Sequence, residues 1–252
     1  MTMINNYNVS FNWLEGDISV FVPVLLALVF FTAYWFITKS ESVKYWFTRR
    51  YDADKASVYH ITFNRITGFA AMGVLPVSVC LMVLPDWSLG DYGLRFDSFT
   101  RVYTVAWTVI LSLLVMPAAF FSARKPANLV NYPVIRARIW TRETVIINTI
   151  GWALYLLGYE FLFRGVLLVP LAEVLGVWPA VAVNVALYSA THIPKGLAET
   201  IGAAPLGLVL CLLTLNSGTI WIAFLVHLAM ALTNSFTALK YNPDMKYQSG
   251  PV

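Results

Sequence analysis

The stretch GYEFLFRG, residues 158–165, places an acid and a base inside a long apolar run that extends over residues 145–171. About 20 apolar residues are enough for a helix to cross the hydrocarbon core of a bilayer. Glu160 and Arg164 are four residues apart, so they share one helical face at salt-bridge distance. A charge inside a membrane span is costly and marks a functional site. The stretch therefore predicts a spanning helix with a buried ion pair.

The composition of the whole chain agrees with a membrane location. The 252 residues are 59% hydrophobic and only 12% charged, whereas soluble domains carry about 25% charged residues. Continuous apolar runs, rather than alternating ones, predict helices. The net charge of +4 resides in short loops between the runs, where it sets topology. We therefore expect the lipid bilayer, and no nucleic acid, as a partner.

The apolar runs predict about seven transmembrane helices, and thus an all-α integral membrane protein. The predicted spans are residues 18–37, 66–85, 102–122, 145–171, 177–193, 203–215 and 219–239. We expect residues 1–144 to hold about three transmembrane helices with cytoplasmic basic loops. Residues 145–240 form a core of about four helices, and residues 241–252 form a polar C-terminal tail.

The charges of the loops predict the orientation of the chain. Residues 1–17 contain no Lys or Arg, whereas residues 38–65 contain six. Basic loops stay in the cytoplasm, so we expect a multi-pass protein of the cell membrane, with the N-terminus outside and the C-terminus cytoplasmic. Within the next basic loop, residues 128–143 mix apolar residues with arginines. This segment is either a helix lying in the interface or a plain linker.

Two histidines fall in predicted spans beside the ion pair. His192 ends the run YSATH, residues 188–192, and His227 lies in the middle of the last span. Glu160 and His192 are the pair expected to deprotonate water, and a second histidine with an amide can stabilise an oxyanion. Asn234 shares a helical face with His227, about two turns further along, and Asn184 is a weaker candidate for that amide. The same residue types can also bind zinc.

These motifs resemble the CPBP or Abi family of membrane proteins, which includes CAAX prenyl endoproteases and bacteriocin self-immunity proteins. The family pattern is E-E-x-x-x-R, then F-x-x-x-H, then H-x-x-x-N on successive helices. Glu160 and Arg164 match the second glutamate and the arginine of the first motif. Tyr188 and His192 match the second motif with Tyr in place of Phe, and His227 matches the third.

The resemblance implies a CPBP-type intramembrane protease core over residues 145–240. It also implies a glutamate-type endopeptidase that uses activated water to hydrolyse a peptide bond of a peptide or membrane-anchored protein. The implied catalytic residues are Glu160, His192 and His227, and the implied supporting residues are Arg164, Tyr159, Asn234 and Tyr188. No cofactor is expected. A divalent metal such as zinc is not favoured, and its ligands would be His192, His227 and Glu160.

Two positions depart from the family pattern. Tyr159 replaces the first glutamate, which is the main general base of the family, and Ala231 replaces the asparagine of the third motif. Either Glu160 acts as the base with Asn234 or Asn184 as the amide, or the chain is an inactive pseudoprotease with a binding, immunity or scaffold role. A transporter is a third alternative, but no inverted repeat is evident in the sequence.

Overall fold

The computed structural model describes residues 12–14, 16–96 and 98–249, and most of them are helical. The elements, in chain order, are α1 (Asp17–Thr38), α2 (Glu41–Arg50), α3 (Ala53–Phe69), η1 (Ala70–Val74), α4 (Leu75–Val83), α5 (Ser98–Ala123), α6 (Pro126–Leu129), β1 (Ile139–Trp140), α7 (Arg142–Glu160), η2 (Phe161–Leu168), α8 (Val169–Leu175), α9 (Val177–Ala190), η3 (Ile193–Lys195), α10 (Leu197–Ser217), α11 (Trp221–Tyr241) and β2 (Lys246–Tyr247). The elements η1 and η2 are π-helical and η3 is a 3-10 turn.

Six helices of the described chain are long and apolar enough to cross a membrane, which confirms an all-α, multi-pass membrane protein. Six of the seven predicted spans lie in these helices. The predicted span 177–193 corresponds to α9, which has only 14 residues. At about 1.5 Å per residue, α9 is about 21 Å long, shorter than the hydrocarbon core of about 30 Å. The count of seven is therefore not confirmed.

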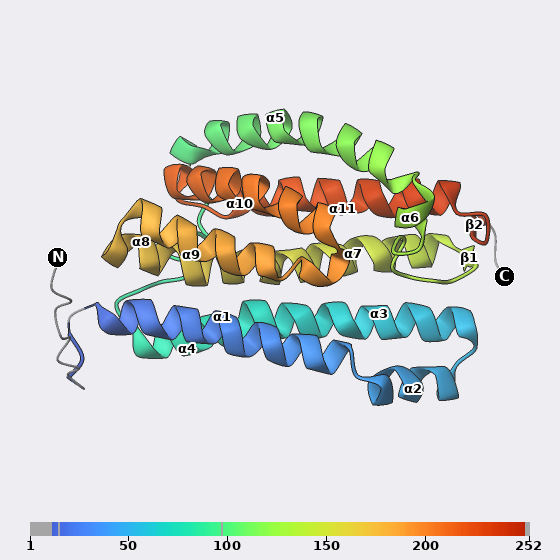
Figure 1. Cartoon of the computed structure of the whole chain (residues 1–252), viewed down its shortest axis with the longest axis horizontal. Coiled ribbons are helices and arrows are strands. Elements are labelled where there is room, and N and C mark those ends of the chain that lie inside the picture. The colour runs from blue at the N-terminus through green and yellow to red at the C-terminus, as the bar shows by residue number, and fades with distance from the viewer. Residues whose placement is uncertain (1–11, 15, 97, 250–252) are drawn as a thin grey trace, which may run out of the picture.

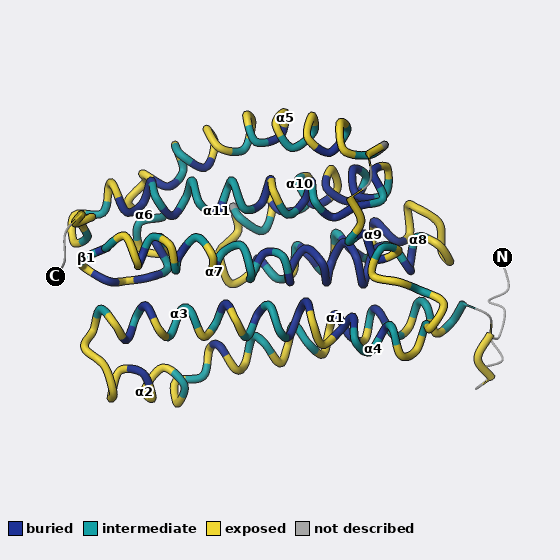
Figure 2. Tube along the Cα trace, turned by 180° about the vertical axis from the view of Figure 1, so that it is seen from behind, coloured by how far each residue is buried: buried dark blue, intermediate teal, exposed yellow. Residues whose placement is uncertain are grey.

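The helices pack in layers around one central helix (Figure 1). A layer of α1, α3 and α4 lies on one side of α7–η2–α8, while α10, α11 and finally α5 lie on the other. Within the most apolar window of residues 142–175, 78% of the residues are buried, against 17% for α1 and for α5. Figure 2 shows the same contrast between the inner and outer helices. The predicted ion pair thus lies on the most enclosed helix.

Basic segments gather at one end of the bundle, which we call the basic end. It is formed by α2, α6, β1, β2 and the start of α7 (Figure 1), and its loops and helix ends carry the basic runs 39–55, 124–142 and 240–246. Helix α1 begins at the opposite end, whereas α11 finishes at the basic end. The segregation of charge is therefore a property of the fold as well as of the sequence.

The segment 128–143 is not an interfacial helix. Only the four-residue α6 is helical at its start, and the chain then runs back against the bundle, where Ile135 and Trp140 are fully buried. The two-residue strand β1 pairs with β2 in parallel, with Ile139 opposite Lys246. Ile135 and Trp140 therefore pack against protein and do not face lipid, whereas Val130 near the start of the segment is exposed. The acidic Glu15 of the predicted outer segment lies outside the described residues.

A contact between two glycines sets the distance between the first layer and the central helix. A Cβ on Gly158 would lie 2.9 Å from the Cα of Phe69, and one on Gly73 would lie 3.1 Å from the Cα of Gly158. Such a close approach of backbones is typical of helix packing in membranes. The contact occurs two residues before Glu160, in the last turn of α7, so it holds the candidate site against α3 and η1.

Candidate active site

Glu160 is at the centre of the candidate site and is completely buried. Its Oε1 lies 2.6 Å from Nδ1 of His227 on α11, and its Oε2 lies 3.4 Å from Nε of Arg164. The predicted ion pair on one face of the helix is therefore formed. The carboxylate of Glu160 contacts His227. The sequence predicted a pair of Glu160 and His192, and the structure does not form that pair.

Arg164 is held in place by neutral groups around the ion pair. Its Nη1 donates to Oδ1 of Asn184 at 2.8 Å, and its guanidinium carbon lies 4.4 Å from the centre of the Tyr188 ring. The side-chain amide of Asn184 donates to the backbone carbonyl of Phe163. Both ends of the Asn184 side chain are thus engaged in the packing of α9 against η2. Asn184 therefore has a structural role beside Arg164, and it does not line the cavity that the two histidines line.

His192 is fixed by the turn that follows α9. Its Nδ1 lies 3.0 Å from the backbone carbonyl of Tyr188 and 3.3 Å from Oγ1 of Thr191. A carbonyl only accepts, so Nδ1 of the neutral ring carries the hydrogen and Nε2 is left as the basic nitrogen. The same argument applies to His227, because Nδ1 donates to the carboxylate of Glu160. Both imidazoles thus keep Nε2 free for chemistry.

Tyr159 contacts both histidines, at the position where the family pattern has its first glutamate. Its ring centre lies 6.5 Å from that of His192 and 5.8 Å from that of His227, in edge-on contacts. Its hydroxyl and Oγ1 of Thr191 are 2.7 Å apart. The tyrosine therefore supports the turn that carries His192, and it puts an aromatic ring where a carboxylate is expected.

The two histidines line one cavity of about 480 Å³, which we call the imidazole cavity. Its wall also includes Tyr188, Ala231 and Asn234, whereas Glu160 lies behind His227 and is not part of the wall. The wall extends to Lys195 and Glu199, whose side chains are 3.9 Å apart. Asn234 is the one predicted amide on this wall, and Ala231, which replaces the family asparagine, also faces the cavity.

The residues do not fit a zinc site with three protein ligands. Glu160 and His227 hydrogen bond directly to each other, and the second carboxylate oxygen faces the positive charge of Arg164. Among the described residues, no group of three or more His, Cys, Asp and Glu side chains is placed to hold one ion. We therefore assign no step of peptide-bond hydrolysis to a metal ion.

Sequence reasoning missed Thr191 and Tyr155. Thr191 links Tyr159 to His192, and only the folded turn reveals that link. Tyr155 lies one helical turn before Tyr159 and lines the imidazole cavity, so its spacing from Tyr159 was the available signal. The position of Glu199 beside a predicted span favours a solvated loop over a place in the site, whereas in the structure Glu199 lines the cavity.

The model of one protein family matches residues 142–233, from the start of α7 into α11. Its description is type II CAAX prenyl endopeptidase Rce1-like, and the matched region includes Glu160, His192 and His227. Searches among curated proteins and among solved structures gave no match. The family match confirms the resemblance that the three motifs indicated. The chain is therefore a multi-pass membrane protein whose residues 142–233 match the model of the Rce1-like type II CAAX prenyl endopeptidases.

Proposed function

We propose that this chain is an intramembrane endopeptidase that hydrolyses a peptide bond of a peptide or a membrane-anchored protein. The observation that supports it most is that His192 and His227 line one cavity, each with Nδ1 hydrogen bonded and Nε2 free. A carboxylate behind an imidazole fixes its tautomer and stabilises the positive charge that forms when it accepts a proton. Among the described residues, a carboxylate hydrogen bonds to His227 but none does to His192, so His227 is the proposed general base.

In the proposed reaction, Nε2 of His227 takes a proton from a water molecule whose oxygen attacks the carbonyl carbon of the substrate. The C–O bond forms, and the carbonyl oxygen becomes an oxyanion. The side-chain amide of Asn234 stabilises this oxyanion by donating a hydrogen bond. The imidazolium of His227 then returns the proton to the leaving nitrogen as the C–N bond breaks. His192 orients the attacking water by accepting its second hydrogen at Nε2.

This assignment differs from the role that the family resemblance gives to Glu160. Glu160 acts through His227 and is a positioning residue, because its two oxygens face His227 and Arg164. The substitution at Tyr159 explains the difference: without a first glutamate, His192 has a tyrosine and a threonine beside it but no carboxylate partner. The carboxylate that remains in the motif supports the other histidine.

The test is a cleavage assay on the full chain in proteoliposomes, with a library of membrane-anchored peptides and detection of products by mass spectrometry. His227→Asn should lower turnover by about 100-fold to 10,000-fold, the range for a lost general base. Glu160→Gln should lower kcat with little change in KM.

The control is Glu173→Gln, which removes an exposed carboxylate on α8. Unchanged turnover in folded His227→Asn protein rejects the proposal. Retained turnover after chelation of metals supports chemistry without a cofactor.

A second candidate function is a catalytically inactive protein that binds a peptide or a partner membrane protein, in an immunity or scaffold role. The observation that favours it is Tyr159, whose ring occupies the position of the missing carboxylate and contacts both imidazoles. The variant in which Glu160, His192 and His227 are all replaced by Ala separates the two candidates. Full cellular function of this variant favours binding, and loss of function with intact folding favours hydrolysis.

The proposed location is the cell membrane with the basic end in the cytoplasm. The support is the charge segregation of the fold, because basic ends of membrane proteins stay in the cytoplasm. A cysteine replacing Ser88, in the loop before α5, should react with an impermeant maleimide added to intact cells. A cysteine replacing Ser249, beyond β2, should react only after permeabilisation. The reverse pattern contradicts the orientation.

A further inference from the structure

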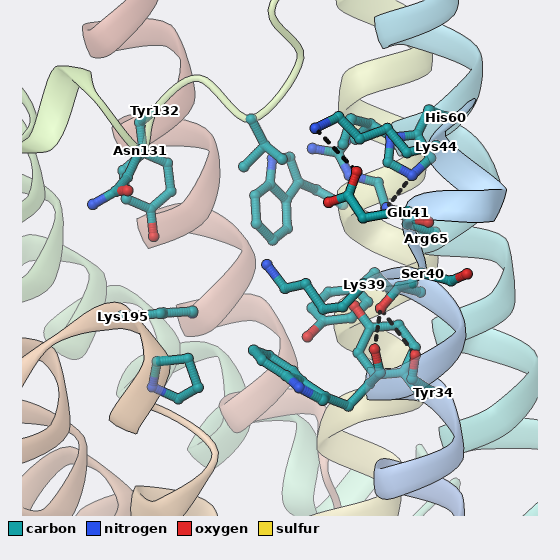
Figure 3. A pocket seen from close by; sticks show the side chains of 18 of the residues that line it. Tyr34, Lys39, Ser40, Glu41, Lys44, His60, Arg65, Asn131, Tyr132 and Lys195 are labelled. Atoms are coloured by element: carbon teal, nitrogen blue, oxygen red, sulfur yellow. Dashed lines mark hydrogen bonds and ion pairs between the residues drawn. The ribbon is translucent and has the colours of Figure 1, made fainter. Parts of the chain in front are cut away.

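A second cavity, of about 500 Å³, adjoins the imidazole cavity and reaches α2 at the basic end. Figure 3 shows most of the side chains that line it. We call it the Arg65 cavity. Side chains from the end of α1, from α2, α3 and α7, and from the turn before α10 line it. The two cavities share five wall residues, which are Tyr132, Trp152, Tyr155, Lys195 and Glu199. The Arg65 cavity has no part in the chemistry proposed above.

Arg65 is a buried cation that has no counter-ion in the part of the chain that the structure describes. It is only 4% exposed, and its two terminal nitrogens donate to the backbone carbonyl and to Oδ1 of Asn148, each at 3.0 Å. Its guanidinium carbon lies 4.5 Å from the centre of the Trp152 ring. No carboxylate of the described chain lies within salt-bridge distance of Arg65. A buried charge of this kind is costly unless an opposite charge accompanies it.

The remaining charges of the wall do not neutralise Arg65. The wall carries four cations and two carboxylates, which are Lys39, Lys44, Arg65, Lys195, Glu41 and Glu199. Lys44 pairs with Glu41 at 3.8 Å, and Lys195 pairs with Glu199 at 3.9 Å. Lys39 lies over the Trp35 ring at 5.0 Å and has no carboxylate partner in the described chain. Four cations less two carboxylates leave two positive charges, those of Arg65 and Lys39, facing one cavity.

The depth of the cavity points to the source of its ligand. Tyr34, Thr38 and Lys39 line it from the last turn of α1 and the residue after it. A membrane-spanning helix ends where the hydrocarbon core meets the lipid headgroups, and Trp and Lys side chains such as Trp35 and Lys39 favour that level. A cavity of this volume is within the range of small-molecule sites, about 300–1,000 Å³. The membrane component found at this depth is the lipid headgroup.

We propose that the Arg65 cavity binds the phosphate of an anionic membrane lipid. Arg65 provides the planar, permanent charge that suits phosphate oxygens, and Lys39 provides the second charge at the rim. The lipid comes from the leaflet at the basic end, and its acyl chains remain in the bilayer beside α1. Through the shared wall of Trp152 and Tyr155, the bound headgroup borders the imidazole cavity.

The test measures lipid retention by native mass spectrometry on the full chain, purified with equal amounts of phosphatidylglycerol and phosphatidylcholine. The wild type should retain one phosphatidylglycerol in preference to phosphatidylcholine. Lys39→Gln should weaken this retention by at least about tenfold, equivalent to about 1.4 kcal/mol, and Arg65→Gln should abolish it. The control is Arg49→Gln, which removes an exposed charge of α2 outside the cavity and should leave retention unchanged.

Three further arms make the proposal decisive. Equal retention in the Lys39→Gln and Arg49→Gln proteins overturns it, and this comparison stands even where Arg65→Gln fails to fold. If millimolar inorganic phosphate displaces the lipid, the site binds free phosphate. If peptides with a free carboxyl end displace it but their amides do not, the site binds a peptide. Either result overturns the proposal that the site binds a lipid. His227→Asn should retain the lipid, so failure of lipid binding is distinguishable from failure of the peptidase.

Discussion

Replacing Arg164 with methionine should destabilise the protein strongly, because it leaves a carboxylate buried without its cation. Glu160 and Arg164 have no exposed side-chain surface and lie 3.4 Å apart. Removing one partner of a buried pair costs about 3–5 kcal/mol. The hydrogen bond from Arg164 to Asn184 is lost as well, whereas methionine retains much of the packing volume. We therefore expect the upper part of this range for Arg164→Met.

The double variant Glu160→Gln with Arg164→Met should be more stable than Arg164→Met alone. It removes both charges from the interior, and a buried pair replaced by neutral groups of similar size is often close to neutral in stability. The introduced glutamine side chain would still accept a hydrogen bond from Nδ1 of His227, so the packing of α7 against α11 is retained. The two single losses should therefore not add, in contrast to substitutions at independent sites.

The assay is reversible unfolding in mixed micelles, with helix content followed as the fraction of denaturing detergent rises. Arg142→Met, an exposed change at the start of the same helix, is the control and should stay within about 0.5 kcal/mol of the wild type. If Arg164→Met costs less than about 1 kcal/mol, or if the double variant loses the sum of the single losses, the pair is not buried as described.

Three smaller predictions test other contacts. Tyr159→Phe removes the hydroxyl that lies 2.7 Å from Oγ1 of Thr191. It should lower the free energy of unfolding by about 1 kcal/mol and slow cleavage. Unchanged stability and unchanged cleavage would refute the contact. Gly158→Ala puts a methyl group 2.9 Å from the Cα of Phe69 and should cost about 1–3 kcal/mol, whereas the control Gly202→Ala, with nothing within 4 Å, should not destabilise. Asn234→Ala should lower kcat by about 100-fold with KM unchanged, and an intact kcat would exclude Asn234 from the oxyanion site.

Hydropathy and motif spacing predicted a large part of this fold. The span around residues 158–165 was predictable because only a helix can carry so many apolar residues across lipid, and the spacing of four fixed the pairing of Glu160 with Arg164. The resemblance to the CPBP family was predictable because three short motifs occur in order. The length of α9 was not predictable, because Ile193 extends the apolar run in the sequence but lies in the exposed turn η3.

The partner of the Glu160 carboxylate was beyond the reach of sequence reasoning. The sequence hypothesis pairs Glu160 with His192, whereas the structure pairs it with His227, because spacing along the chain does not tell how helices rotate against one another. The π-helical turns η1 and η2 add to this difficulty, because they shift the phase of a helix without a change in hydropathy. The amide of Asn184 was equally ambiguous in sequence, and only its contacts with Arg164 and Phe163 exclude it from the cavity.

Solid-state NMR on the full chain in lipid bilayers tests the pairing of Glu160 with His227 most directly. With ¹⁵N-labelled histidine and ¹³C-labelled glutamate, the spectrum should show a correlation between Nδ1–H of His227 and the side-chain carboxyl carbon of Glu160, consistent with the 2.6 Å contact. This correlation should vanish in Glu160→Gln protein and persist in His192→Asn protein. A correlation that connects Glu160 to His192 instead, or to neither ring, would contradict the proposed catalytic arrangement.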